Sequence, residues 1–280
     1  MIAMVEPQPT EADAFRRFEH ESWERVAGIY AESWGELTAR FAPPLLAALA
    51  VRPGVRLLDL ACGTGAVTAA ALARGAVPVG LDFSRSMLAE ARRRHPGLRF
   101  EEGDAAALPF AAASFDVVSM GFGVMHLAWP DRAFAEARRV LRPGGRFGFT
   151  LWAGAEQCAG EQIIARAITA LADPTGAPAG PPPGRFRDPE ECRRALGAAG
   201  FAPSSLTFST HTASWLLASV DGLFETERSA GVRTGALLAR QTPERLAAIR
   251  EAVRREVARC RTDTGYAVPM AAHVVGAVAG

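Results

Sequence analysis

The sequence predicts an α/β protein built on a doubly wound, mostly parallel sheet. Between residues 55 and 152, short β-rich runs alternate with Ala- and Arg-rich helical stretches, and this alternation implies right-handed βαβ crossovers. A glycine-rich turn at residues 61–65 follows the first run, where a strand of such a sheet passes into a helix. The length of 280 residues fits one large α/β domain with additions.

The first expected elements are N-terminal helices. Residues 11–50 carry apolar and aromatic residues at helical spacing, punctuated by Pro43 and Pro44. The alternating region follows, with strands expected near residues 55–60, 77–82, 98–102, 115–120 and 146–152, and helices near 65–74, 85–94 and 131–141.

The second half of the chain supplies the last two strands. A stretch rich in Pro, Gly and Ala from Asp173 to Gly184 is expected to be a surface loop. Asp188-Pro189-Glu190-Glu191 then combines an N-cap, a first-turn proline and an N3 acid, which predicts a helix. Residues 203–213 and 265–278 look extended, and 219–260 look helical. The predicted sheet therefore has seven strands, with a helical insertion between the last two.

The charge balance disfavours a polyanionic partner. There are 31 basic and 30 acidic residues, giving a net charge of +1, so no long-range field would draw nucleic acid or an anionic membrane to the chain. Every basic residue in that count is Arg. The absence of Lys excludes enzyme classes that need a Schiff-base lysine, a pyridoxal-phosphate anchor or a P-loop lysine.

The cysteines give no sign of a metal or disulfide framework. Cys62, Cys158, Cys192 and Cys260 are scattered without a paired spacing, so we expect no metal site. No apolar run reaches the roughly 18 residues of a membrane span, and residues 1–15 lack the features of a secretory signal. We therefore expect a soluble, cytoplasmic protein without membrane insertion.

The glycine turn and two strand-end acids predict an adenosyl-ligand site. In Leu57-Leu58-Asp59-Leu60-Ala61-Cys62-Gly63-Thr64-Gly65, an apolar strand enters a turn where a ligand can approach the backbone. Thr68 stands where the dinucleotide fingerprint has its third glycine, which disfavours a nicotinamide cofactor. Asp82 ends the second strand, where an acid can accept both ribose hydroxyls. Asp104 ends the third strand and could accept a hydrogen bond from an adenine amine.

Residues 55–152 resemble the class I S-adenosylmethionine-dependent methyltransferases, particularly the UbiE-like branch, which have a Rossmann-like fold. The resemblance rests on five motifs in order. They are Asp59-Leu60-Ala61-Cys62-Gly63-Thr64-Gly65, Gly80-Leu81-Asp82-Phe83-Ser84, Gly103-Asp104-Ala105 with Leu108-Pro109-Phe110, Ser114-Phe115-Asp116-Val117-Val118, and Val140-Leu141-Arg142-Pro143-Gly144-Gly145. The outer thirds of the chain match only loosely, so the resemblance does not extend to the substrate.

This resemblance implies S-adenosyl-L-methionine as the cofactor. Gly63 and Gly65 would pass close to its methionine part, Asp82 would hold the ribose, and Phe83 and Ala105 would border the adenine. The full set of expected cofactor-binding residues is Asp59, Ala61, Gly63, Gly65, Asp82, Phe83, Met87, Asp104, Ala105, Gly121 and Phe122. Ala61 departs from the family's commonest motif, which has Gly there; since Ala is nearly as small, we expect little effect.

His126 is the candidate general base. By resemblance the segment Met120–His126 borders the methyl-transfer centre, and an imidazole titrates near neutrality. The alternative is that His126 caps the following helix or packs beneath Trp129. The same segment lacks the N/D/S-P-P-Y/F motif of nucleobase amino methyltransferases and a Pro-Cys nucleophile, which disfavours nucleic acid as substrate.

Aromatic residues outside the core are candidates for a lid and a substrate cap. Trp23, Tyr30 and Trp34 could fold over the cofactor, or could serve ordinary helix packing. In the inserted region Trp215 and Phe224 could line a substrate cap. Arg228 and Arg233 could grip a carboxylate there, but a solvated, salt-bridged helix face is the preferred interpretation.

These observations predict transfer of a methyl group from S-adenosylmethionine to a small molecule, at oxygen or nitrogen. Carbon methylation of a quinone-like ring is the alternative within the same class, and a cofactor-binding protein without turnover is the alternative outside it. The expected organisation is a helical lid over residues 1–50, a cofactor-binding core over 51–152, and the rest of the sheet with its helical cap over 153–280.

Overall fold

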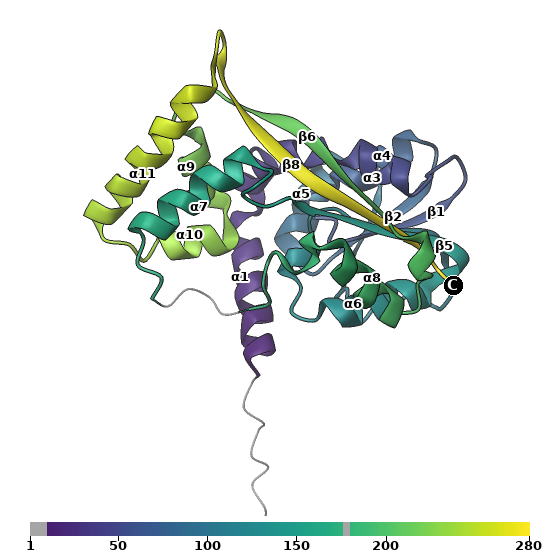
Figure 1. Cartoon of the computed structure of the whole chain (residues 1–280). Helices are drawn as coiled ribbons and strands as arrows, with labels where there is room; N and C mark the ends of the chain where they lie inside the picture. The colour runs from purple at the N-terminus through teal and green to yellow at the C-terminus, as the bar shows by residue number, and fades with distance from the viewer. Residues whose placement is uncertain (1–9, 176–179) are drawn as a thin grey trace, which may run out of the picture.

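The protein folds around one sheet with helices on both faces. The computed structural model describes residues 10–175 and 180–280; residues 1–9, at the start of the expected lid, and 176–179, inside the expected surface loop, lie outside them. The sheet has the strand order β3-β2-β1-β4-β5-β8-β6, and a short β7 pairs with β8 (Figure 1). The α/β class and the mostly parallel sheet are confirmed.

The parallel part of the sheet follows the predicted alternation closely. Its elements are β1 (Arg56–Leu60), α4 (Ala66–Ala73), β2 (Val77–Asp82), α5 (Arg85–Arg94), β3 (Arg99–Glu102), β4 (Phe115–Met120), η1 (Val124–His126), α6 (Pro130–Val140) and β5 (Leu141–Trp152). The strands end together at one edge, because β1 pairs in parallel with both β2 and β4. Ligands of open α/β sheets bind at this edge.

Alternating side chains of the strands build a separate core on each face. Leu58 of β1 and Val118 of β4 face the core under α6 and α8 (Pro189–Ala198). Their neighbours Leu57 and Val117 face the opposite core, under α3 (Ala42–Ala48) and α4. Buried parallel strands have this continuous apolar character because both faces are covered. Figure 1 shows the two helix layers on opposite faces.

The last two long strands close the sheet in antiparallel pairing. β8 (Gly265–Val278) lies between β5 and β6 (Thr207–Leu217) and pairs antiparallel with both. β7 (Arg261–Thr262) forms a short hairpin with β8. Sequence order and spatial order therefore differ at this edge of the sheet.

Helices outside the sheet layers surround its ligand-binding edge. α1 (Glu11–Ala31) and α2 (Trp34–Ala39) precede the core, and α7 (Ala159–Leu171) follows β5. α9 (Gly222–Ala230), α10 (Val232–Leu238) and α11 (Pro243–Val257) occupy the expected insertion between β6 and β8. Figure 1 shows α7, α9, α10 and α11 gathered beyond one end of the sheet.

Four details differ from the sequence prediction. The sheet has eight strands rather than seven, because the short β7 is added beside β8. No helix is expected from the sequence where α7 forms, although Ile163, Ile164 and Ala167 make a buried helical stripe there. β6 extends four residues beyond the predicted 203–213, because its pairing with β8 continues to Leu217. The helical stretch 219–260 is divided twice, at Gly231 and at residues 239–242. At Gly231 an added Cβ would lie 2.5 Å from the Glu227 carbonyl oxygen.

Short connecting elements complete the described chain. They are η2 (Arg185–Arg187), η3 (Pro203–Ser205) and η4 (Ala258–Cys260). Asp188 caps α8 as predicted, since its side chain accepts a hydrogen bond from the Glu190 backbone N–H. Within the described residues, no helix combines the length and the apolar character needed to cross a bilayer.

Candidate functional site

The glycine turn is held in shape by a fully buried carboxylate. Asp59 lies near the end of β1 with none of its surface exposed. It accepts hydrogen bonds from the Thr68 hydroxyl of α4 (2.7 Å) and the Ser119 hydroxyl of β4 (2.9 Å). Burial raises the pKa of Asp59 to about 7. Asp59 thus ties two strands and a helix together immediately before the turn.

Asp82, at the end of β2, fixes the turn from the neighbouring strand. Its Oδ2 accepts a hydrogen bond from the Gly63 backbone N–H (2.8 Å), and its Oδ1 accepts one from the Ser84 N–H (2.9 Å). The side chain is buried, and burial raises its pKa to about 6. Each carboxylate oxygen has a second lone pair, so Asp82 retains acceptor capacity toward a ligand.

Backbone conformation explains the small residues of the turn. Gly63 and Gly65 have φ of +52° and +85°, and Ala61 has φ of +50°, a region that residues with a Cβ adopt at a cost. At Gly65 an added Cβ would also lie 2.8 Å from Phe100 Cζ. Ala61 therefore carries a backbone strain that the more common glycine would not.

Gly65→Ala is expected to destabilise the protein by about 1–3 kcal/mol, because strained φ and a steric contact combine. Gly97→Ala is a matched control, since Gly97 has φ of +91° but no atom within 4 Å of an added Cβ. Urea unfolding should show a larger loss for Gly65→Ala than for Gly97→Ala. Equal losses would show that the Phe100 contact has no energetic weight.

A cavity runs along the carboxyl ends of β1, β2 and β4, and we call it the strand-end cavity. Its empty space amounts to about 640 Å³, part of it open to solvent. Its lining residues are Trp23, Tyr30, Ala61, Gly63, Leu81, Asp82, Phe83, Met87, Gly103, Asp104, Ala105, Gly121, Phe122, Gly123, His126 and Leu127. Glycines, apolar side chains and two acids thus meet at the predicted edge.

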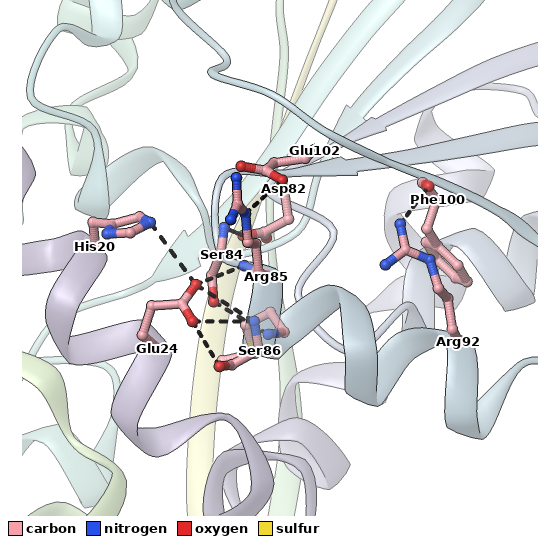
Figure 2. A network of polar contacts seen from close by, with 10 residues as sticks. His20, Glu24, Asp82, Ser84, Arg85, Ser86, Arg92, Phe100 and Glu102 are labelled. Atoms are coloured by element: carbon pink, nitrogen blue, oxygen red, sulfur yellow. Dashed lines mark hydrogen bonds and ion pairs between the residues drawn. The ribbon is translucent and has the colours of Figure 1, made fainter.

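Helix α1 docks across this cavity through polar contacts. Arg16 donates to Asp104 Oδ2 (2.8 Å). Glu24 accepts from the Arg85 N–H (2.6 Å) and from the Ser86 hydroxyl (2.6 Å), at the first turn of α5 (Figure 2). A carboxylate is stabilised at a helix N-terminus by the free N–H groups there. Figure 2 shows Asp82 bonded to Ser84 beside the same turn.

A buried glutamate on α1 joins the helix to His126. Glu19 has no exposed surface. Its Oε2 lies 2.9 Å from His126 Nδ1 and accepts from Trp23 Nε1 (3.1 Å), and its Oε1 accepts from Arg233 Nε (3.2 Å). Arg233 also donates to the Met125 carbonyl oxygen. We call these four residues (Glu19, Trp23, His126 and Arg233) the Glu19 cluster.

The Glu19 cluster replaces two expectations from sequence. His126 does not cap the next helix, and its ring lies edge-on to that of Trp23, with centroids 4.9 Å apart. The solvated helix face predicted for Arg228 and Arg233 is wrong for Arg233, whose side chain is 22% exposed and bound to Glu19. It holds for Arg228, which is half exposed and pairs with Glu225.

A second cavity, which we call the aromatic chamber, shares His126 with the first in its lining. It encloses about 730 Å³, part of it open to solvent. Its lining residues are Trp23, Tyr30, Trp34, Thr38, Phe122, Met125, His126, Trp152, Glu161, Pro183, Glu227, Ala230, Gly231, Val232, Arg233 and Thr234. Trp23, Tyr30, Phe122 and His126 line both cavities, so the two meet at these residues.

Two carboxylates face the aromatic chamber. Glu227 of α9 is 7% exposed, and burial raises its pKa to about 8; the negative charge of Glu161 adds to the rise, and the Thr234 hydroxyl opposes it. Burial also raises the pKa of Glu161, and Arg187 opposes that rise. Arg187 Nη2 lies 3.5 Å from Glu161 Oε2.

Glu227→Gln is expected to gain stability over the wild type as the pH rises. The unfolded pKa of Glu227 is near 4.5, so the stabilisation from its proton is complete below that pH and is lost as the pH rises through about 8. Between about pH 6 and 9 the variant should gain roughly 2 kcal/mol on the wild type. Urea unfolding across this range checks the prediction, with Glu225→Gln as control, because Glu225 is partly exposed and pairs with Arg228. A difference that does not change with pH would contradict it.

Most of the residues predicted for the cofactor line the strand-end cavity. They are Ala61, Gly63, Asp82, Phe83, Met87, Asp104, Ala105, Gly121 and Phe122. Asp59 instead borders a smaller pocket behind the turn, and Gly65 begins α4 against Phe100. Of the predicted lid residues, Trp23 and Tyr30 line both cavities, and Trp34 lines the chamber alone.

Trp215, predicted to line a substrate cap in the insertion, lies on β6 instead and lines neither cavity. It is buried, and its ring lies 4.4 Å from that of Trp34 between centroids. Sequence reasoning missed Glu19, Glu161 and Glu227. Glu19 follows Phe15 by four residues and precedes Ser22 and Val26 on the buried stripe of α1, and an acid in such a stripe is the signal that could have revealed it.

Comparisons with known proteins identify the central segment. Residues 58–149 match a family model described as a methyltransferase domain. Over 101 residues the chain is 48% identical to a demethylmenaquinone methyltransferase of Beutenbergia cavernae, covering 36% of this chain and 42% of that protein. Over 109 residues it is 43% identical to the enzyme of the same name from Renibacterium salmoninarum, covering 39% and 46%. The matches thus span less than half of these relatives.

Solved structures show the same fold over a longer stretch. The structure of the [4+2]-cyclase SpnF aligns with this chain over 98% of each of the two chains, with a TM-score of 0.56 at 20% sequence identity. The family predicted from the five motifs is confirmed for the segment that carries them, and S-adenosyl-L-methionine is the cofactor of this domain type. Residues 58–149 therefore form a class I S-adenosylmethionine-dependent methyltransferase domain.

Proposed function

We propose that the protein transfers the methyl group of S-adenosylmethionine to a small-molecule acceptor bound in the aromatic chamber. The observation that carries the proposal is that two cavities meet at Trp23, Tyr30, Phe122 and His126. One is lined by the strand-end residues expected to bind the cofactor, and the other by aromatic rings suited to a flat organic molecule.

The strand-end cavity fits an adenosyl cofactor. Asp82 would accept the ribose hydroxyls with its remaining lone pairs, and Phe83 and Ala105 would border the adenine. Gly63 has no atom within 4 Å of an added Cβ, so its open side leaves room for the methionine part. Asp104 would accept a hydrogen bond from the adenine amine. Its Oδ2 now accepts one from Arg16, so the two donors would share the carboxylate or Arg16 would move away.

The bound cofactor supplies an activated methyl group on a sulfonium, so the protein must mainly align the acceptor and exclude water. α1 contributes to the exclusion of water, since its Trp23 and Tyr30 cover part of both cavities. Glu19 beside His126 Nδ1 favours the tautomer with its hydrogen on Nδ1. Nε2 is then an acceptor that can remove a proton from a hydroxyl or ammonium group.

Carbon methylation of a quinone-like ring is a second candidate. The apolar rings of Trp34, Trp152 and Phe122 around the chamber and the names of the two relatives favour it. The fold does not decide the chemistry, because a cyclase shares it. A cofactor-binding protein without turnover is the candidate outside the enzyme class.

Calorimetric titration with S-adenosylmethionine and, separately, with NADH tests the cofactor assignment. Saturable binding of the first alone is expected, followed by formation of S-adenosylhomocysteine when phenols, amines and quinols are offered as acceptors. No S-adenosylmethionine binding by folded protein would overturn the proposal. Binding without product for every acceptor would favour the non-catalytic alternative.

A further inference from the structure

The aromatic chamber contains a carboxyl group, that of Glu227, for which the described residues supply no counterion. Glu227 is 7% exposed and lines the chamber. Its carboxylate oxygen packs over Gly231, where an added Cβ would lie 2.6 Å from Oε2. Among residues 10–175 and 180–280, no Arg or His forms an ion pair with it. A buried carboxylate without a counterion is costly unless it holds a proton or meets a cation.

The other charged groups of the chamber are already paired. Arg233 lies 3.2 Å from Glu19 and donates two more hydrogen bonds to carbonyl oxygens. Glu161 faces Arg187 at 3.5 Å. His126 contacts Glu19 at 2.9 Å. Among the described residues that line the chamber, Glu227 is therefore the acid whose carboxyl group has no ion-pair partner and can pair with a ligand.

The walls of the chamber suit a cation as well. Trp23, Tyr30, Trp34 and Trp152 line it, and the faces of such rings attract an ammonium group most strongly where water is excluded. Trp34 and Trp152 are each 8% exposed. An apolar body with a positive end would therefore meet both the rings and a counterion.

We infer that the chamber binds its acceptor through a protonated amine, with the Glu227 carboxylate as the counterion. This rests on the proposed function only in naming the bound molecule as the methyl acceptor. His126 and Phe122 line both the chamber and the strand-end cavity, so an amine-bearing ring held at Glu227 would lie beside the residues that border the cofactor site.

Binding is coupled to a proton. Since burial raises the pKa of Glu227 to about 8, the empty chamber holds a neutral carboxyl group near pH 7. An ammonium ligand favours the carboxylate. Complex formation should therefore release about one proton at pH 7.

Calorimetric titration of the full chain with phenethylamine and with 2-phenylethanol tests the inference. The two probes share their ring and length but differ in charge at pH 7. We expect phenethylamine to bind at least about tenfold more tightly. Titrations in buffers of different ionisation enthalpy should show the proton release. Glu227→Gln should remove both effects, whereas Glu225→Gln, on the exposed side of the same helix, should keep both.

Three outcomes would overturn the inference: equal affinity for the two probes, no binding of phenethylamine at millimolar concentration, or a preference that persists in Glu227→Gln. A parallel titration with S-adenosylmethionine separates this test from the proposed function. Retained cofactor binding without an amine preference defeats the amine inference alone. Loss of cofactor binding defeats the proposed function, while the amine preference is still measured directly.

Discussion

Asp82→Asn is expected to weaken S-adenosylmethionine binding by at least about a hundredfold. In the wild type one carboxylate oxygen holds the Gly63 N–H and the other holds the Ser84 N–H. The amide of Asn places a donor against one of these N–H groups, so the turn loses its anchor. It also removes the charged acceptor for the ribose, and hydrogen bonds to charged groups contribute about 1.5–3 kcal/mol each.

Calorimetric titration of the purified variant measures this loss. Glu102→Gln is the matched control, because Glu102 ends the next strand but pairs with Arg85 outside the cavity (Figure 2). Circular dichroism establishes that both variants are folded. Wild-type affinity in folded Asp82→Asn would remove Asp82 from the cofactor site.

Glu19→Ala is expected to reduce the free energy of unfolding by about 3–5 kcal/mol, because removing one partner of a buried ion pair leaves the other uncompensated. Glu19 is fully buried and contacts Arg233, His126 and Trp23 at once. The substitution also leaves a cavity on the buried stripe of α1.

Urea denaturation at pH 7 measures the effect. The control is Glu256→Gln on α11, whose pairing with Arg259 lies at the surface and should change stability by less than about 1 kcal/mol. A loss in Glu19→Ala no larger than in the control would mean that α1 is not held through Glu19.

The sequence predicted the central part of the molecule well, because its signals are local. Strand β2 and helix α5 have the bounds that were expected, and the carboxyl ends of the strands bring Asp82 and Asp104 to one cavity. Gly63 and Asp82 follow the ends of neighbouring strands, and in the structure the Gly63 N–H donates to Asp82 Oδ2 at 2.8 Å. The assignment of these residues to parts of the cofactor stays a prediction.

The acceptor side could not be predicted in the same way, because it depends on contacts between distant segments. Glu19, His126 and Arg233 come from three separate elements that only the tertiary fold brings together. Helical spacing nevertheless contains a hint, since Glu227 shares a buried stripe with Leu223 and Ala230. A polar residue in such a stripe therefore indicates a buried polar site.

The backbone conformation of the glycine turn also could not be predicted from the sequence. Replacing Gly by Ala at position 61 looked minor by size, yet φ is +50° there. Composition does not reveal a positive φ, which arises from the path of the chain between β1 and α4.

The position of β8 has a consequence for how the chain folds. β5 and β8 pair although more than a hundred residues separate Trp152 from its partner Ala272, and β6 finds its only partner among the described strands in β8. Ends so far apart close slowly, since the entropy of the intervening loop must be lost first. During synthesis β1 to β5 can associate early, whereas β6 cannot pair until β8 has been synthesised. A chain shortened before residue 265 would consequently lose the pairing of two strands, and β5 would become an exposed edge open to association with other chains.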